Sequence, residues 1–309
     1  MSQGKRTRKD IYKERLEVYN RERHLIGRVR TTVAGLSAVH LLGKTEKGAP
    51  SPVGTGVLFK NGDKLFVLTA AHVAEEFSNG KSAYISFPNQ LLGVYGQVHA
   101  SANPKSNNSN GDPLDFAAMR IDGEAARFLS PLAITAKDVF NPPPGVTLGA
   151  GLVIVGFPAR DFKRKGSNFY YPPTPMESRG VPLKTYQSLG LSTDDHQVLQ
   201  WYNTMYTSEG VVRSRSLAGM SGCGVWLVPD LMGEPFPPRA PWTQPKLIGI
   251  FTEHRKARSV LIATKIHCHL DKIIEYYPGL PLSLRFRLIS DLFQSDEPTT
   301  AQRSESEPR

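Results

Sequence analysis

The chain has 309 residues, of which 39% are hydrophobic and 21% charged, so it is long enough to bury a sizeable core and too apolar for a disordered chain. Its 27 glycines and 24 prolines are typical of short elements joined by many turns and exclude a long helical bundle. Of the net charge of +10, residues 1–30 carry ten Lys and Arg against four Asp and Glu, so the basic excess says little about nucleic-acid binding by the rest.

That basic segment is the first predicted element. After Asp10, a suitable N-cap, Ile11–Ile26 places four apolar residues on one helical stripe among Lys, Arg and Glu, so residues 1–30 are predicted to form an amphipathic helical arm. The stripe consists of Tyr12, Leu16, Tyr19 and Ile26. Three roles stay open for the arm: packing on the body, docking a regulatory protein partner, or contacting nucleic acid or an anionic membrane. The apolar stripe favours the first two, because phosphate binding alone needs no apolar face.

The next residues, up to about 140, have the pattern of antiparallel β-structure. Short apolar or alternating runs are separated by turn sequences such as Asn61-Gly62-Asp63 and by an Asn- and Ser-rich loop at Asn103–Gly111. The expected strands are Leu36–Leu42, Gly56–Lys60, Leu65–Thr69, Ala83–Phe87 and Phe116–Ile121.

A second β-rich half follows a proline-rich boundary at Asn141–Pro144. Its expected strands are Gly151–Phe157, Val198–Tyr202, Val211–Arg213, Gly224–Val228, Lys246–Thr252 and Ser259–Thr264. The stretch Pro158–Gln197 is predicted to be a long loop, a length that usually has a function. His267–Tyr277 is predicted to be a helix, and the polar tail from about residue 295 is predicted to be disordered.

Cysteine usage and hydropathy bear on the compartment. Cys223 and Cys268 are the only cysteines, and the chain shows no secretory leader, so no disulfide framework is expected. Every apolar run is strand-sized, well short of the roughly 18 residues of a membrane-spanning helix. We therefore expect a cytoplasmic protein without a membrane span.

A candidate acid–base pair lies in the first half. The β-type run Leu65–Thr69 leads through two alanines to His72, which places a general base at the end of a rigid element. Asp115 precedes the apolar run Phe116–Ile121, which is expected to bury its carboxylate beside the histidine. Asp112, in a Gly-Asp-Pro turn, is the weaker candidate. Such a carboxylate fixes the tautomer of a histidine that accepts a proton from a serine hydroxyl.

The candidate nucleophile is Ser221, in Gly219-Met220-Ser221-Gly222-Cys223-Gly224. Its glycines permit a tight bend that aims the N–H groups of Gly219 and Ser221 at one point, which is the geometry of an oxyanion hole.

Three motifs, in this order, resemble the trypsin/chymotrypsin-like serine protease family, and in particular its bacterial, disulfide-free members. They are Thr69-Ala70-Ala71-His72, Asp115-Phe116-Ala117-Ala118-Met119 and Gly219-Met220-Ser221-Gly222. The resemblance covers residues 31–275 and implies an all-β fold of two six-stranded antiparallel β-barrels. It also implies an endopeptidase that forms an acyl-enzyme at Ser221 on a protein or peptide substrate and needs no cofactor; with the expected cytoplasmic location, this predicts an intracellular enzyme.

The domain boundaries follow from the same resemblance. Residues 31–140 form the first barrel, with His72 and Asp115, and residues 141–275 form the second barrel, with Ser221. The arm 1–30 and a C-terminal extension 276–309 lie outside both.

Substrate-binding positions are implied as well. Leu247–His254 resembles the strand that lines the substrate channel, which puts Thr252 behind the catalytic residues and Glu253 and His254 against the substrate backbone. Arg213–Ala218 then forms a wall of the specificity pocket. Arg215 in that wall either selects an acidic side chain or is a solvated loop charge, whereas Glu253 favours a basic side chain; both alternatives stay open.

Two residues beside Ser221 depart from the family pattern. Met220 replaces an aspartate that pairs, in many relatives, with an N-terminus newly exposed by precursor cleavage, so that activation route is not expected. Cys223 stands where glycine is usual and is interpreted as a packing residue. Restraint of the enzyme then falls to narrow specificity or to an activating partner, with Arg160–Gln197 as a candidate lid over the cleft.

Other function classes are less well supported. A catalytically silent, protease-like binding or scaffold module is the main alternative, and the intact His, Asp and Ser argue against it. A nucleic-acid-binding β-protein rests on net charge alone. No metal site is predicted at His267, Cys268 and His269, because adjacent ligands cannot all face one ion from a regular element and no second cluster supplies further ligands.

Overall fold

The structure is a computed structural model, and its description is confined to part of the chain. The described residues are 32–77, 83–87, 90–94, 96–101, 114–143, 147, 151–162, 173–202, 204–207, 210–213, 216–228 and 244–278. The predictions for the arm 1–30, the loop at Asn103–Gly111, Asp112 and Arg215 lie outside these residues.

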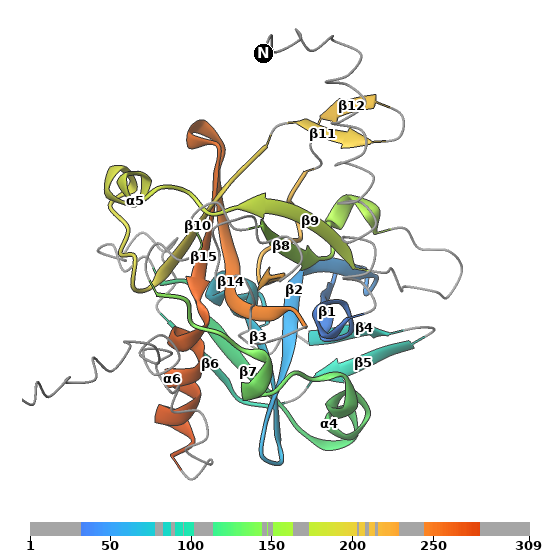
Figure 1. Cartoon of the computed structure of the whole chain (residues 1–309). Helices are drawn as coiled ribbons and strands as arrows, with labels where there is room; N and C mark the ends of the chain where they lie inside the picture. Colours follow the sequence, from blue (N-terminus) through green and yellow to red (C-terminus); the bar gives the residue numbers. More distant parts are fainter. Residues whose placement is uncertain are drawn as a thin grey trace, which may run out of the picture.

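Two curled antiparallel β-sheets form the framework of the described residues (Figure 1). The first contains seven strands in the order β5-β4-β1-β2-β3-β7-β6. Its strands are β1 (Ala38–Lys44), β2 (Pro50–Asn61), β3 (Lys64–Thr69), β4 (Ala83–Phe87), β5 (Gln90–Val94), β6 (Val98–Ala100) and β7 (Ala117–Ile121). β2 and β3 are joined by a two-residue turn, since Asn61 pairs with Lys64, as the Asn-Gly-Asp sequence predicted.

The second sheet contains six strands in the order β10-β15-β14-β13-β8-β9. Its strands are β8 (Gly151–Gly156), β9 (Thr174–Arg179), β10 (His196–Gln200), β13 (Gly224–Leu227), β14 (Lys246–Arg255) and β15 (Val260–Lys265). A separate hairpin is formed by β11 (Thr204–Thr207) and β12 (Gly210–Arg213). The predicted double-barrel, all-β fold class is confirmed, with seven strands rather than six in the first sheet because the short β6 pairs with β7.

The prediction of one long loop over Pro158–Gln197 is wrong. Residues Thr174–Arg179 pair with all of β8 as the edge strand β9, and Leu183–Leu189 form helix α5. Tyr186 of α5 is buried, and its hydroxyl accepts the N–H of Val198 at 2.9 Å, so this helix belongs to the body of the second sheet. The lid predicted for Arg160–Gln197 stays a prediction, because residues 163–172 lie outside the described residues.

Short helices connect and cover the strands. They are α2 (Val33–Leu36), α3 (Ala71–Glu75), α4 (Gly123–Leu129), α5 (Leu183–Leu189), α6 (Ile266–Tyr276) and the 3-10 turns Ser130–Leu132, Ala136–Asp138, Ala159–Asp161 and Lys256–Arg258. The predicted C-terminal helix is confirmed as α6. Among the described residues, no helix has the length and apolar character needed to cross a membrane.

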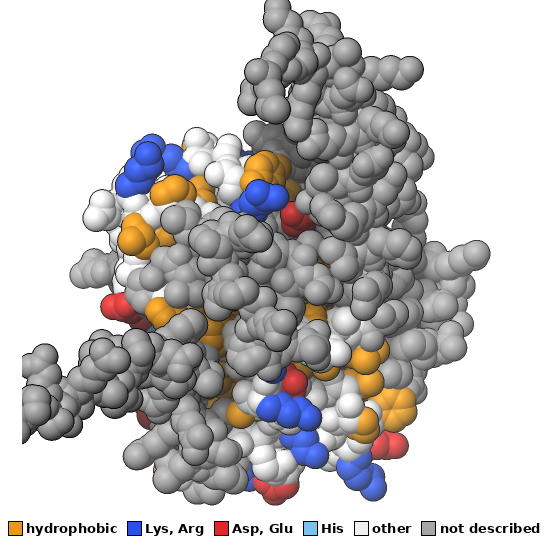
Figure 2. Space-filling model, in the orientation of Figure 1, with side chains coloured by type: hydrophobic (Ala, Val, Ile, Leu, Met, Phe, Trp, Pro, Cys, Tyr) orange, Lys and Arg blue, Asp and Glu red, His pale blue; other side chains and the backbone are white. Residues whose placement is uncertain are grey.

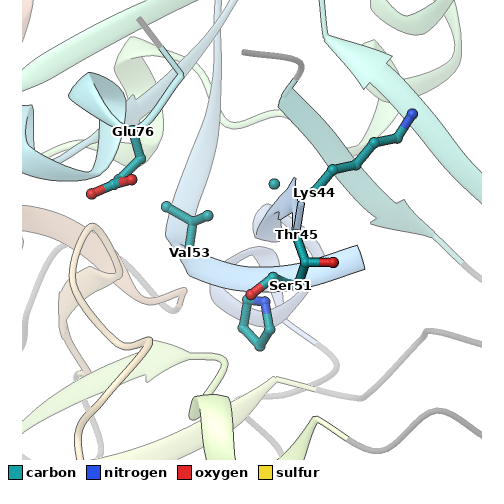
Figure 3. A pocket seen from close by; sticks show the side chains of 7 residues that line it. Lys44, Thr45, Ser51, Val53 and Glu76 are labelled. Atoms are coloured by element: carbon teal, nitrogen blue, oxygen red, sulfur yellow. The ribbon is translucent and has the colours of Figure 1, made fainter. Parts of the chain in front are cut away.

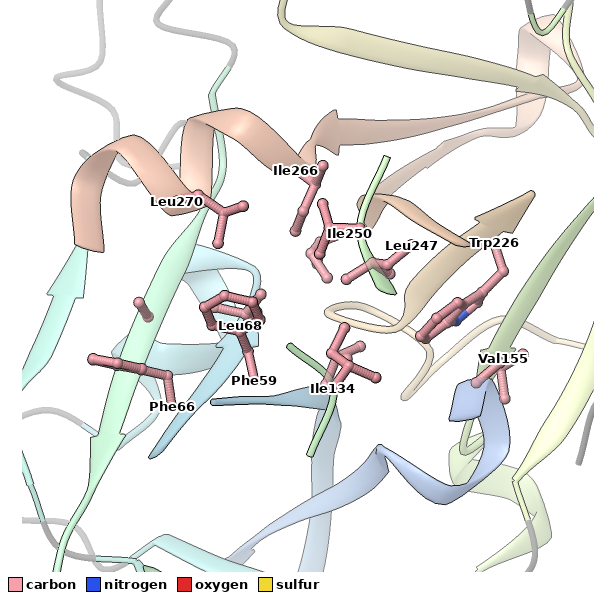
Figure 4. Packing of buried hydrophobic residues seen from close by; sticks show 14 of the residues in the cluster. Phe59, Phe66, Leu68, Ile134, Val155, Trp226, Leu247, Ile250, Ile266 and Leu270 are labelled. Carbon is pink, nitrogen blue, oxygen red and sulfur yellow. The ribbon is translucent and has the colours of Figure 1, made fainter. Parts of the chain in front are cut away.

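One buried cluster joins the two sheets and α6 (Figure 4). Phe59, Phe66 and Leu68 enter it from β2 and β3, while Trp226 and Leu247 enter from β13 and β14. Ile266, Leu270 and Ile273 of α6 complete it. Burying large apolar side chains from both sheets holds the ends of β3 and β13 in fixed relation, at about 1.5–3 kcal/mol per side chain.

The connection between the sheets follows the same core. Ile134 forms a bridge to Phe59 of the first sheet, and Val139 forms a bridge to Leu247 of the second.

On the face shown in Figure 2, basic and acidic side chains of the described residues are interspersed rather than gathered by sign.

Candidate active site

The acid–base pair is placed by the pairing of β3 with β7. Thr69, the last residue of β3, is opposite Ala117, the first residue of β7. Asp115 therefore enters the sheet edge where the chain leaves β3 towards His72. The histidine itself lies in the first turn of α3 rather than on the strand.

Two hydrogen bonds tie Asp115 to His72. The ring Nδ1–H of His72 donates to Asp115 Oδ2 at 2.6 Å, and the backbone N–H of His72 donates to Oδ1 at 3.1 Å. The side chain of Asp115 is 5% exposed and that of His72 17%, so the carboxylate is sheltered while the ring reaches solvent. This arrangement fixes the proton on Nδ1 and turns Nε2 away from the carboxylate as the basic nitrogen.

The turn around Ser221 needs its glycines. Gly219 and Gly222 have φ angles of +84° and +88°, which residues with a side chain rarely adopt. A Cβ on Gly222 would lie 2.0 Å from Thr55 O and 2.1 Å from Thr69 Oγ1, so the turn presses directly on β2 and β3. Within the turn, the N–H of Met220 donates to Leu217 O at 2.9 Å.

The two halves of the site meet at Gly54 and Thr55 of β2. The N–H of Thr55 donates to the carbonyl of Ser221 at 2.9 Å. A Cβ on Gly54 would lie 2.7 Å from Val73 and 3.0 Å from Ser221 O, so the residue that follows His72 and the candidate nucleophile contact the same glycine. Val73, the neighbour of His72, and the carbonyl of Ser221 therefore both lie against Gly54 of β2.

Thr55 is a site residue that the sequence reasoning missed. Its hydroxyl donates to Gly219 O at 3.0 Å and accepts the N–H of Phe157 at 3.0 Å, while its own carbonyl accepts the Thr69 hydroxyl at 2.8 Å. This fully buried threonine therefore holds the carbonyls of both Gly219 and Ser221. The only sequence signal was its place in Gly54-Thr55-Gly56.

The N–H groups of Gly219 and Ser221 are available for a ligand. Within the described part of the chain, neither forms a hydrogen bond, whereas the N–H groups of Gly222 and Cys223 donate to Phe251 O and Met220 O. Burial raises the pKa of Cys223 well above its usual value, and its side chain is fully enclosed, in keeping with a packing role.

The predicted substrate-channel strand lies beside the turn. Phe251 of β14 exchanges two backbone hydrogen bonds with Gly222 and Cys223, at 2.7 and 2.8 Å. Thr252, expected behind the catalytic residues, is buried, and its hydroxyl donates to Ile262 O at 3.2 Å. After a bulge, Glu253 accepts a hydrogen bond from Arg255 at 3.0 Å.

His254 packs edge-on against Trp201, with ring centroids 4.8 Å apart. Its pKa is lowered by burial and by Lys256. This histidine is therefore largely neutral near pH 7 and offers an apolar face.

A pocket lies next to α3, beside the β1–β2 hairpin (Figure 3). Its lining includes Lys44, Ser51, Val53 and Glu76. Val53 precedes Gly54 in the chain, and Glu76 follows α3. The pocket therefore lies next to Gly54, the residue that both Val73 and Ser221 O approach.

A further side chain that could ligate a metal lies near His267 and Cys268, where the sequence reasoning expected none. Asp195, from the turn before β10, lies 3.8 Å from His267 Nε2 and 3.9 Å from Cys268 Sγ. His269 lies apart from them, with Nε2 3.3 Å from Thr69 O, so it belongs to the packing behind the active site.

Comparison with known proteins gives matches in structure alone. No protein-family model and no curated protein sequence matches the chain. It resembles the structure of neuropsin, a serine protease expressed in the limbic system of mouse brain, with 16% identity, a TM-score of 0.49 and coverage of 80% of this chain and 96% of that one.

Two further structures are similar. A Glu endopeptidase shares 12% identity with a TM-score of 0.47, covering 81% of this chain and 94% of that one. A scabies mite inactivated protease paralogue shares 14% identity with a TM-score of 0.47, covering 81% and 98%. The structures that this chain resembles are thus trypsin/chymotrypsin-like serine proteases, the family that the three motifs indicated.

Proposed function

We propose that this chain, which has the fold of the trypsin/chymotrypsin-like serine proteases, is an intracellular serine endopeptidase. The observation that carries the proposal is the 2.6 Å hydrogen bond from His72 Nδ1 to Asp115. His72 lies in α3, and this helix and the Ser221 turn both lie against Gly54. A protein or peptide substrate follows from the fold family.

In the proposed reaction, Ser221 Oγ attacks the carbonyl carbon of the scissile bond while His72 Nε2 accepts the hydroxyl proton. The N–H groups of Gly219 and Ser221 stabilise the negative charge on the carbonyl oxygen, each worth about 3 to 4 kcal/mol. As the C–N bond breaks, His72 returns the proton to the leaving amine. Water then hydrolyses the acyl-enzyme by the same route in reverse.

The packing of Met220 supports a site that needs no precursor cleavage. Its side chain is fully buried with Phe140, Leu217 and Val225, so apolar contacts hold the nucleophile turn where many relatives use an ion pair. We propose that any activation is due to a protein partner instead. The predicted docking of that partner on the arm 1–30 stays a prediction, as does the cytoplasmic location.

Labelling with a fluorophosphonate probe tests the function. The purified full chain is expected to gain one adduct, located at Ser221 by intact mass and peptide mapping. Ser221→Ala and His72→Ala are each expected to abolish labelling, while both variants retain the circular dichroism of the parent. An unlabelled parent, or labelling that persists in Ser221→Ala, would contradict the proposal and leave a protease-like binding module as the better description.

A further inference from the structure

A second cluster of chemically active side chains lies away from the Ser221 turn. His267 and Cys268 occupy the first turn of α6, and Asp195 ends the turn that precedes β10. Within the described residues, these are the three His, Cys, Asp or Glu side chains whose ligand atoms lie close enough to share an ion.

The spacing of the three ligand atoms is that of a coordination shell. His267 Nε2, Cys268 Sγ and Asp195 Oδ1 are separated by 3.5, 3.8 and 3.9 Å. The N–O separation is longer than a direct hydrogen bond, which is about 2.7–3.2 Å. The point equidistant from the three ligand atoms lies about 2.2 Å from each of them. Zinc bonds to sulfur, nitrogen and oxygen are about 2.0–2.3 Å long, so an ion at this point would be within bonding distance of all three.

We propose that Asp195, His267 and Cys268 bind one Zn²⁺ ion. The donor set selects the metal, because a thiolate with an imidazole disfavours Ca²⁺ and Mg²⁺, which take oxygen ligands. Three protein ligands leave a fourth position for water in tetrahedral geometry.

The surroundings of the cluster carry negative charge. Burial raises the pKa of Cys268 to about 12, and the carboxylates of Asp195 and Asp271 add to the rise. The two carboxylates beside the thiol attract a cation. Lys265 is a cation near the cluster. Its ammonium group donates a hydrogen bond to Pro142 O at 3.1 Å, and its pKa is lowered by burial.

A nucleophilic role for Cys268 fits the geometry less well. The thiol and the carboxylate both face Nε2 of His267, while Nδ1 is buried without a hydrogen-bond partner in the described part of the chain. A catalytic Cys-His-Asp arrangement needs the carboxylate on the other nitrogen. In addition, a thiol that is 8% exposed with a raised pKa is a poor nucleophile.

The ion would connect two parts of the second sheet. The backbone N–H of Lys265 already donates to Asp195 O at 2.8 Å, so the turn and the start of α6 are in register. One helical turn contains both Cys268 and His269, and His269 reaches Thr69 O at the end of β3. Zinc at this place is therefore expected to stabilise the helix that packs behind His72 and Asp115.

Cobalt titration of the full, metal-stripped and reduced chain tests the proposal. Co²⁺ is expected to produce a thiolate-to-cobalt charge-transfer band that saturates at one equivalent and is bleached when Zn²⁺ displaces it. The two cysteines form a matched pair: Cys268→Ala should lose the band, and Cys223→Ala should keep it. Absence of the band in the parent, or its loss only in Cys223→Ala, would overturn the proposal.

Asp195→Asn provides a second variant with the same side-chain volume, in case a cysteine variant fails to fold. The Asp195 side chain is 41% exposed, so the fold tolerates an amide there. Calorimetric titration with Zn²⁺ should show binding weakened by more than the roughly 10- to 100-fold loss that second-sphere changes cause. Unchanged affinity in this variant would overturn the proposal, and the measurement does not depend on hydrolytic activity.

Discussion

Two clusters in this chain combine an aspartate, a histidine and a residue with a nucleophilic side chain. In the first, Asp115 holds Nδ1 of His72 at 2.6 Å, and the backbone of Ser221 lies against Gly54, next to the neighbour of His72. In the second, Asp195 and Cys268 both face Nε2 of His267 at 3.5–3.8 Å. The ring nitrogen that the carboxylate holds therefore decides which chemistry each cluster can perform.

The difference also lies in how the clusters are built. The first unites elements of two sheets across a fully buried core, so its members are fixed relative to one another by packing. The second joins one turn to the first residues of a helix, and its carboxylate is nearly half exposed. The proposed catalytic cluster therefore depends on packing between the sheets, whereas the proposed zinc cluster can exchange its ion with solvent through the exposed side of Asp195.

Replacing each carboxylate by an amide is the sharpest test of this comparison. Asp115→Asn is expected to lower kcat by about 10⁴-fold, because the amide favours the wrong tautomer of His72. The measurement is hydrolysis of a peptide substrate by the purified variant at pH 7 to 8.

Asp122→Asn is the matched control for that change. Asp115 precedes β7 and Asp122 follows it, but Asp122 is paired with Arg120 at the surface, at 2.8 Å. Its removal should leave kcat within about twofold, since surface pairs contribute little. Equal losses in both variants would show that Asp115 acts on stability rather than on His72.

Thr55 tests whether packing alone fixes the Ser221 turn. Thr55→Val removes the hydroxyl that donates to Gly219 O, so kcat is expected to fall about 100-fold with little change in KM, through misplaced oxyanion donors. Thr55→Ser keeps the hydroxyl and should restore most of the activity. If the serine variant is as slow as the valine variant, the hydroxyl is not what positions Gly219.

The second cluster should respond in stability. At a free Zn²⁺ concentration of 100 times Kd, binding is expected to raise the free energy of unfolding by about 2.7 kcal/mol, or Tm by about 5–10 °C. Thermal unfolding followed by circular dichroism measures the shift. Asp195→Asn should abolish it and Asp122→Asn should retain it, so a shift of equal size in both variants would exclude the proposed ligand.

Sequence reasoning named His72, Asp115 and Ser221 because each of them sits in a motif of its own: His72 follows a strand, Asp115 precedes one and Ser221 lies in a glycine turn. The structure joins His72 to Asp115 by a hydrogen bond, and the role of Ser221 stays a prediction. Thr55 and Asp195 carry no such motif. Their contacts depend on how distant parts of the chain pack together. Thr55, for example, donates hydrogen bonds to the carbonyls of Gly219 and Ser221, more than 160 residues away.

The same reason explains the mistaken loop and the rejected metal site. Pro158–Gln197 was judged from its prolines, yet its residues Thr174–Arg179 gain their strand structure from pairing with β8. His267 and Cys268 were judged alone, whereas Asp195, the third proposed ligand, lies in a turn that tertiary packing brings to α6. Non-local pairing decides these features, and a local pattern does not encode it.

A third histidine, His40, extends the comparison, because within the described residues its ring is hydrogen-bonded to neither a carboxylate nor a thiol. It is buried in β1 and stacks on Phe157 with centroids 5.0 Å apart, and within the described residues its ring nitrogens have no hydrogen-bond partner. Burial lowers its pKa to about 4, below the unfolded value of 6.5. Between these values the unfolded chain binds the proton and the native protein does not, so stability is lost as the pH falls from 6.5 towards 4.

His40→Phe should therefore flatten the dependence of stability on pH. Removing one such proton is expected to reduce the slope of the unfolding free energy by about 1.4 kcal/mol per pH unit between pH 6 and 4.5. Urea denaturation at a series of pH values measures it. His269 supplies a comparable slope through its own pKa of about 4, so the variant should keep part of the dependence. If parent and variant have the same slope, a neutral buried His40 is not the source of the acid sensitivity.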